Sequence, residues 1–184
     1  MRALLRFAAR GLFLGLFALS AIPLYAEERI QLATDPALSP DGQTLIFSYR
    51  DGVWSAPVAG GVARPITTDE NTESDARYSP DGKTIAFISN RTGSRQVYLM
   101  PAVSGAPTQI THHTAGYSLK GWSPDGSQLL VSGSRDHFWR RPDRLFWIPK
   151  EGRAAEVPLF DDYGADPSVS PDGKKILFTR EGEA

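Results

Sequence analysis

Cysteine is absent from this chain of 184 residues, and neither sign of charge is in excess, with 20 basic and 21 acidic residues. Without cysteine, no disulfide can hold the fold, and no lipoprotein anchor can follow an export signal. Burial of hydrophobic side chains therefore has to stabilise the folded chain.

The N-terminal segment lacks a hydrophobic run long enough to cross a bilayer, because the apolar stretch 11–19 is too short. It has a basic head with three arginines and a small-residue exit at 24–26, which predict a secretory signal cleaved after Ala26. We therefore expect 1–26 to be a signal peptide, 27–184 the folded domain, and the protein to be exported, periplasmic or secreted. The alternative is an uncleaved N-terminal anchor; after cleavage, no stable membrane anchor is expected.

Cleavage would remove three basic residues and no acidic ones, which leaves 17 basic against 21 acidic residues and a net charge of −4. This mild acidity is spread along the chain. It argues against a nucleic-acid partner.

The tetrapeptide Ser-Pro-Asp-Gly occurs four times, and it begins at Ser39, Ser79, Ser123 and Ser170. The intervals from serine to serine are 40, 44 and 47 residues, a spacing typical of the four-stranded blades of a propeller. Ser, Pro, Asp and Gly in this order suit the four positions of a type I turn, so each copy predicts a tight hairpin turn. The predicted structural turn residues are Pro40, Asp41, Gly42, Pro80, Asp81, Gly82, Pro124, Asp125, Gly126, Pro171, Asp172 and Gly173.

Apolar runs flank each turn and indicate the strands of successive blades. We expect an all-β fold, a partial beta-propeller of about three and a half four-stranded antiparallel blades. The expected strands are 36–39, 44–49, 53–58 and 63–67; 76–79, 84–89, 96–102 and 108–111; 119–123, 128–132, 144–149 and 156–160; and 167–170 and 175–180.

The fourth repeat has only two of its four expected strands, so one sheet edge and one apolar face would lack a neighbour. This predicts that the chain is a fragment of a longer protein. The alternative is that the ring is completed by self-association.

The pattern Asp-x-x-apolar-Ser-Pro-Asp-Gly-x-x-apolar-apolar-Phe, as in 75–87, resembles the WD-like propeller repeat of TolB-type and tricorn-type proteins. The stretches 53–67 and 97–111 resemble the third and fourth strands of those blades. The runs 113–118, 134–140 and 160–164 are similar to the N-terminal propeller of bacterial tricorn-type serine peptidases. The resemblance covers residues 30–184 and implies a six-bladed type of propeller when complete.

The tricorn resemblance implies a noncatalytic module that gates or binds peptide substrate, or supports the protease domain, in an exported serine peptidase. None of the peptidase region is recognised in this chain, so no residue here is assigned a catalytic role. The implied partners are a peptide or protein, the missing C-terminal blades and the peptidase domain. The alternative is a TolB-like periplasmic interaction propeller without enzymatic activity.

One loop is the best candidate for binding. Loops between second and third strands lie at the end of the propeller opposite the Ser-Pro-Asp-Gly turns, and the one at 133–143 is long, where binding usually resides. We expect it to contact a peptide or a neighbouring domain through an aromatic anchor and an arginine that pairs with a carboxylate. The candidate contact residues are Arg135, Asp136, His137, Phe138, Trp139, Arg140 and Arg141. The other reading of Phe138 and Trp139 is that they fill the interface between blades.

Other candidates have plainer explanations. Ser134, Asp136 and His137 stand too close together in sequence for a catalytic triad, which favours a surface loop. The pair His112-His113 lacks the spacing of zinc ligands, and neither a calcium loop nor a glycine-rich phosphate loop is present, so no metal or cofactor is expected. Three aspartates recur four residues before the turn serine, which indicates a structural hydrogen bond between blades rather than a carboxylate ring; they are Asp35, Asp75 and Asp166.

Overall fold

The computed structural model describes residues 29–68, 71–103, 105–134, 143–152, 157–160 and 164–180. Every regular element within these ranges is a β-strand. Over the same ranges, none of the chain forms a helix with the length and hydrophobicity that a membrane crossing needs.

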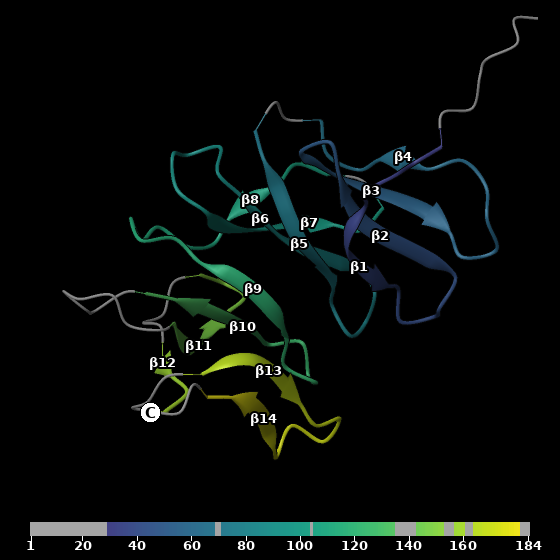
Figure 1. The fold of residues 1–184 in the computed structure, drawn as a ribbon. Coiled ribbons are helices and arrows are strands. Elements are labelled where there is room, and N and C mark those ends of the chain that lie inside the picture. Colours follow the sequence, from purple (N-terminus) through teal and green to yellow (C-terminus); the bar gives the residue numbers. More distant parts are fainter. Residues whose placement is uncertain are drawn as a thin grey trace, which may run out of the picture.

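The strands form successive antiparallel sheets, each built from strands that are consecutive in sequence, and Figure 1 shows the sheets side by side in an open arc. The first three sheets have four strands each and the last has two, β13–β14, which confirms the expected partial propeller. In chain order the strands are β1 (Thr34–Leu38), β2 (Thr44–Tyr49), β3 (Gly52–Pro57), β4 (Arg64–Pro65), β5 (Glu73–Tyr78), β6 (Thr84–Ser89), β7 (Gln96–Pro101), β8 (Thr108–Gln109), β9 (Ser118–Trp122), β10 (Gln128–Gly133), β11 (Arg144–Pro149), β12 (Val157–Pro158), β13 (Ala165–Val169) and β14 (Ile176–Thr179).

The Ser-Pro-Asp-Gly copies share one hydrogen-bond pattern, and they lie at one end of the sheets, which we call the turn face. In the first copy the Gly42 amide donates to the carbonyl of Ser39 at 2.8 Å, which closes the turn. The Ser39 hydroxyl donates to Oδ1 of Asp41 at 2.5 Å, and the Thr44 amide donates back to Ser39 Oγ at 2.9 Å. These contacts satisfy backbone donors where the strands separate, so the tetrapeptide fixes its turn without help from the rest of the fold.

Neighbouring turns also touch one another. The turn glycines have φ near +70°, and a Cβ on Gly82 would lie 3.4 Å from Cδ of Pro40 in the preceding turn. Gly126 is placed in the same way against Pro80. Each turn proline therefore packs against the glycine of the next blade.

Side chains of the middle sheet alternate between two hydrophobic cores. Ile85 and Phe87 of β6 pack in a cluster with Ile46 of β2. Ala86 and Ile88 point the other way, into a cluster that contains Leu129 of β10 and its neighbours. Because side chains alternate between the two faces of a strand, the middle sheet packs through hydrophobic side chains on both the preceding and the following sheet.

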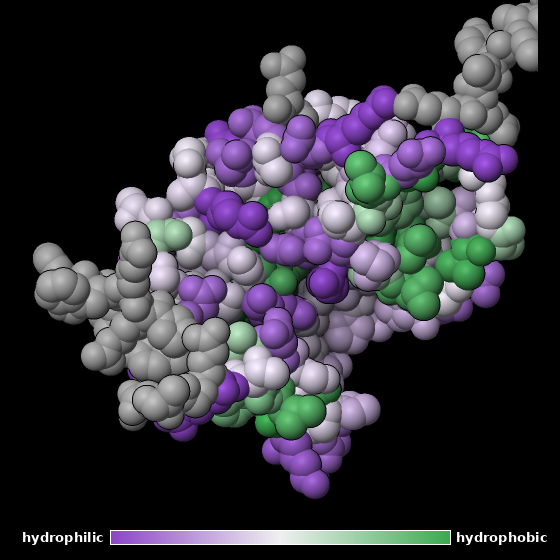
Figure 2. Space-filling view, viewed as in Figure 1, coloured by the Kyte–Doolittle hydropathy of each residue, from purple (hydrophilic) through white to green (hydrophobic). Residues whose placement is uncertain are grey.

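The two ends of the arc expose faces of the same kind. Leu45 and Phe47 take the β2 positions that face a preceding sheet in the later blades, and here they line a groove of about 570 Å³. At the other end, Leu177 is 77% exposed, whereas Leu130, at the same repeat position one blade earlier, is 1% exposed. Figure 2 shows hydrophobic surface over the first sheet and again near β13 and β14.

The observed strand bounds differ from the predicted ones mainly in the first and the fourth strand of each blade. The fourth strands were expected at 63–67, 108–111 and 156–160, but β4, β8 and β12 have two residues each. The first strands begin earlier than expected because a bulge lets pairing resume beyond it, as between Thr34 and Ala37 of β1.

Candidate functional site

The loops between second and third strands lengthen along the chain. We call the end of the sheets that carries them the loop face. The loop is residues 50–51 between β2 and β3, 90–95 between β6 and β7, and 134–143 between β10 and β11. The third loop holds the predicted contact residues 135–141, which lie outside the described residues. Asp143, at the C-terminal end of this loop, accepts a hydrogen bond at Oδ2 from Ser132 Oγ of β10 at 3.1 Å.

In the first blade the loop face is a tight turn. Arg50 and Asp51 both have positive φ, 48° and 62°, as a type I′ hairpin turn requires. The Arg50 guanidinium lies 5.2 Å from the centre of the Tyr49 ring, and the Asp51 carbonyl accepts the Glu73 amide at 2.8 Å. The first strand of the second blade is thereby bonded to the loop face of the first.

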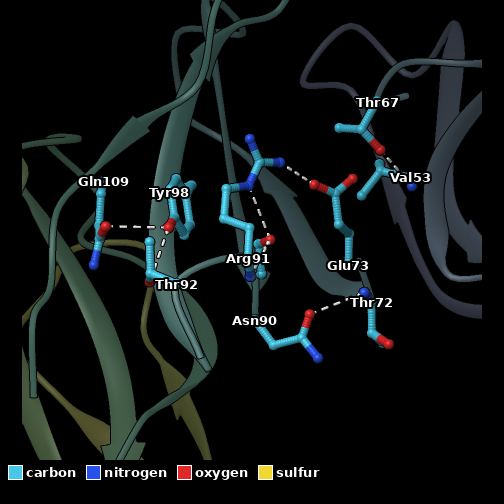
Figure 3. Close-up of polar contacts among 10 residues, drawn as sticks. Val53, Thr67, Thr72, Glu73, Asn90, Arg91, Thr92, Tyr98 and Gln109 are labelled. Atoms are coloured by element: carbon cyan, nitrogen blue, oxygen red, sulfur yellow. Dashed lines mark hydrogen bonds and ion pairs between the residues drawn. The ribbon is translucent and has the colours of Figure 1, made fainter. Parts of the chain in front are cut away.

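A buried ion pair lies beside this junction (Figure 3). The Glu73 side chain is fully buried at the start of β5, and it forms an ion pair and hydrogen bond with the Arg91 guanidinium. Arg91 also lies over the ring of Tyr98, 4.8 Å from its centre, and its Nε donates to Ser89 Oγ at 3.0 Å. The arginine of the second loop is thus held in a fixed position by charge, hydrogen bonds and an aromatic surface.

The pairs Ile66-Thr67 and Ile110-Thr111 follow the fourth strands, and their threonine side chains bind backbone amides on this face. Thr111 Oγ1 accepts the Val97 amide at 2.9 Å, and Thr67 Oγ1 accepts the equivalent Val53 amide at 3.0 Å. Thr111 also donates to Gln96, whose amide donates to the His113 carbonyl at 2.6 Å. These hydrogen bonds fix the chain as it leaves one blade for the next.

The recurrent aspartates adopt an unusual backbone conformation. Asp35, Asp75 and Asp166 have φ of 52°, 56° and 48°, and each lies within the bulge of its first strand. Aspartate tolerates this left-handed region better than most residues, which explains its recurrence. The third blade has Leu119 at this position, and there the extra residue of the first strand is Lys120, because Leu119 pairs with Val131 and Gly121 with Leu130.

The aspartate side chains bond mainly within their own blades, so the expected hydrogen bond between blades takes another form. Asp75 Oδ2 accepts Arg95 Nη2 at 2.9 Å within the second blade. Between blades, it is the backbone carbonyl of Asp35 that accepts the Arg77 guanidinium, at 3.4 Å. Burial raises the pKa of Asp75, and the positive charge of Arg95 opposes that rise.

Neither candidate for catalysis or metal binding gains support from the described residues. His113 Nδ1 accepts the Ala115 amide at 3.2 Å, and its ring lies 6.3 Å from that of Tyr117. Within the described ranges, no group of three His, Cys, Asp or Glu residues is placed to hold a metal ion. Asp136 and His137 lie outside those ranges.

Comparison with known proteins identifies the fold family. The sequence profile of the tricorn protease N-terminal beta propeller domain matches residues 30–184. This chain belongs to that family. The propeller with its bulged inner strands and repeated hairpin turns is therefore the tricorn-type N-terminal propeller that the sequence resembles.

Relatives of this family member include peptidases. The chain is 37% identical to the uncharacterized peptidase YuxL of Bacillus subtilis over an alignment of 190 residues. The alignment covers 79% of this chain and 29% of YuxL. It is 34% identical over 94 residues to tricorn protease homolog 1 of Streptomyces coelicolor, across 50% of this chain and 9% of the homolog. The chain thus spans less than a third of these relatives.

A solved structure gives the same fold. A protein of Agrobacterium tumefaciens assigned as a TolB superposes with a TM-score of 0.69 and 27% identity, over 80% of this chain and 53% of that one. The tricorn N-terminal propeller and the TolB-type propeller thus share the architecture found here.

Proposed function

We propose that this chain is a noncatalytic propeller module of an exported tricorn-like peptidase, and that its loop face binds peptide substrate or supports the protease domain. The match of residues 30–184 to the tricorn N-terminal propeller carries the proposal. The similarity to YuxL and to the Streptomyces homolog, each far longer than this chain, supports a peptidase as the parent protein. The signal-like segment 1–26 supports export to the periplasm or beyond.

The loop between β10 and β11 is the part of this face that we assign to recognition. Its length and its composition support the assignment, because aromatic and arginine side chains dominate binding energy at protein surfaces. Trp139 or Phe138 would act as an apolar anchor, and Arg140 or Arg141 would pair with a carboxylate. The fixed position of Arg91 supports the view that the described part of the same face is rigid.

Peptide binding tests this proposal. Fluorescence anisotropy with a pool of labelled peptides should give saturable binding to residues 27–184, weakened about tenfold or more by Arg140→Ala with Arg141→Ala. The control is Lys174→Ala with Lys175→Ala, which removes the same charge from the turn face. Equal binding by both double variants would refute the role of the loop.

A TolB-like interaction propeller is the second candidate, favoured by the fold match to the Agrobacterium protein. Such a module would bind a folded protein partner rather than peptides. Pull-down of an intact protein by the loop face, with no retention of peptides, would favour this candidate over the first.

The open faces of the arc support a further part of the proposal, namely that blades of the same kind complete the ring in the parent protein. The groove lined by Leu45 and Phe47 and the exposed Leu177 have the positions and chemistry of blade interfaces. Light scattering on residues 27–184 tests this: a single defined oligomer would favour ring completion by self-association instead.

A further inference from the structure

A cavity opens on the turn face between the second and third blades, on the opposite side from the loop proposed to bind peptide. It has a volume of about 320 Å³. We call it the turn cavity. Its lining includes Pro80, Asp81, Trp122, Pro124, Asp125 and Lys150.

Two carboxylates of the cavity are held in place as anions. Asp81 Oδ1 accepts the Ser79 hydroxyl at 2.6 Å and the Lys83 amide at 3.1 Å. Asp125 Oδ1 accepts the Ser123 hydroxyl at 2.6 Å and the Ser127 amide at 3.1 Å, and Oδ2 accepts the Ser127 hydroxyl at 2.8 Å. The bond from Ser123, followed by those from Ser127, lowers the pKa of Asp125 to about 2. Since the turns fix both side chains, the carboxylates lose little freedom when they bind a ligand.

Trp122 provides an aromatic wall. Its indole Nε1 donates to the Arg77 carbonyl of the neighbouring blade at 3.3 Å, and the ring packs against the core between the second and third blades. The same repeat position holds Leu38 in the first blade and Tyr78 in the second. The junction at Trp122 therefore pairs the largest aromatic surface of these positions with two carboxylates.

The side chains that line the cavity carry a net charge of −1, which one bound cation would neutralise. Asp81 and Asp125 contribute two negative charges, and Lys150 contributes one positive charge on an exposed, flexible side chain. Lys83 also lies close enough to Asp81 to stabilise its anionic form, but it does not line the cavity.

We propose that the turn cavity binds an arginine side chain of a protein or peptide partner, with the guanidinium stacked on Trp122 and hydrogen-bonded to Asp81 and Asp125. A planar guanidinium can do both at once, because it stacks on indole through its face and donates through its edge. This makes the turn face a second recognition surface, independent of the loop face.

The direct test uses N-acetyl-arginine amide as the probe, with the neutral N-acetyl-citrulline amide as its matched control. The indole ¹H–¹⁵N signal of Trp122 reports on binding to residues 27–184. We expect a saturable shift with the arginine probe and an affinity at least about tenfold lower for citrulline. No shift, or an equal shift with both probes, would overturn the proposal.

The repeats supply matched variants. Asp81→Asn with Asp125→Asn should weaken binding about tenfold, whereas Asp41→Asn with Asp172→Asn should leave it within about twofold. In both pairs a neutral amide oxygen replaces the charged acceptor of the serine hydroxyl in two turns, so a shared loss of binding would attribute the effect to the turns and contradict the cavity.

Lys150→Ala is a second test that leaves the side-chain hydrogen bonds of the turns intact. It removes the ammonium group that competes with the guanidinium for the two carboxylates, so the arginine probe should bind more tightly. Unchanged or weaker binding would count against the proposed charge balance.

Discussion

The exposure of one repeat position at two places gives the sharpest test of the blade architecture. Leu130 and Leu177 both take the β-strand position that faces the following blade, but Leu130 is buried at 1% exposure and Leu177 is 77% exposed. Truncation of a buried leucine to alanine costs about 2–5 kcal/mol, whereas truncation of an exposed one changes the free energy of unfolding by about 0.5 kcal/mol or less. We therefore expect Leu130→Ala to be strongly destabilising and Leu177→Ala to be nearly neutral.

Urea unfolding followed by far-UV circular dichroism measures both variants against the unchanged chain of residues 27–184. For a domain of this size, Leu130→Ala should also lower the melting temperature by about 4–20 °C. The variants share the same chemical change at the same repeat position, so the difference reports the burial that the following sheet and the third strand of the same sheet provide around Leu130. Equal effects of the two substitutions would refute the packing described here.

Three further changes test other parts of the fold. The pKa of Asp125 is lowered to about 2, so its contribution to stability is present above about pH 4 and is lost as the pH falls through about 2. The Ser123 hydroxyl is the main cause of the lowered pKa, so Ser123→Ala should reduce the decrease in the urea midpoint between about pH 5 and pH 2. Glu73→Gln removes the buried negative charge that pairs with the partly buried Arg91 and should cost about 3 kcal/mol in the free energy of unfolding; an unchanged free energy would argue against the ion pair. Gly82→Ala forces alanine to φ near +70° and should cost about 1–2 kcal/mol, whereas Gly121→Ala, with open space around it, should cost less than about 0.5 kcal/mol.

The blades could be predicted from the sequence because their signals are local. The hydrogen bonds of the first turn join residues within 39–44, and the second strands β2 and β6 fall at the predicted 44–49 and 84–89. Alternation within the strands likewise follows from short stretches of sequence. The fold class therefore needed no information about distant contacts.

Features that depend on pairing between distant segments could not be predicted in the same way. The aspartate of the bulge recurs because of its backbone conformation, and a bulge is visible only once the register of β5 against β6 is known. The ion pair between Glu73 and Arg91 joins a strand start to a loop, and the sequence marks neither residue as special. Glu73 lies three residues before the predicted strand 76–79, so no pattern in the sequence indicated that its side chain would be buried.

The candidate loop illustrates the same limit. Its composition points to binding, but the residues that would contact a ligand depend on the conformation of the loop, which no local pattern of Arg135 to Arg141 determines.

One measurement tests the central claim that this propeller module binds peptides without cleaving them. Residues 27–184 would be incubated with a defined peptide mixture, passed through an ultrafiltration membrane, and both fractions analysed by mass spectrometry. The account predicts that some peptides are retained with the protein and that every peptide is recovered intact. Cleavage products that increase with the amount of purified chain, or a retained fraction without any peptide, would contradict it.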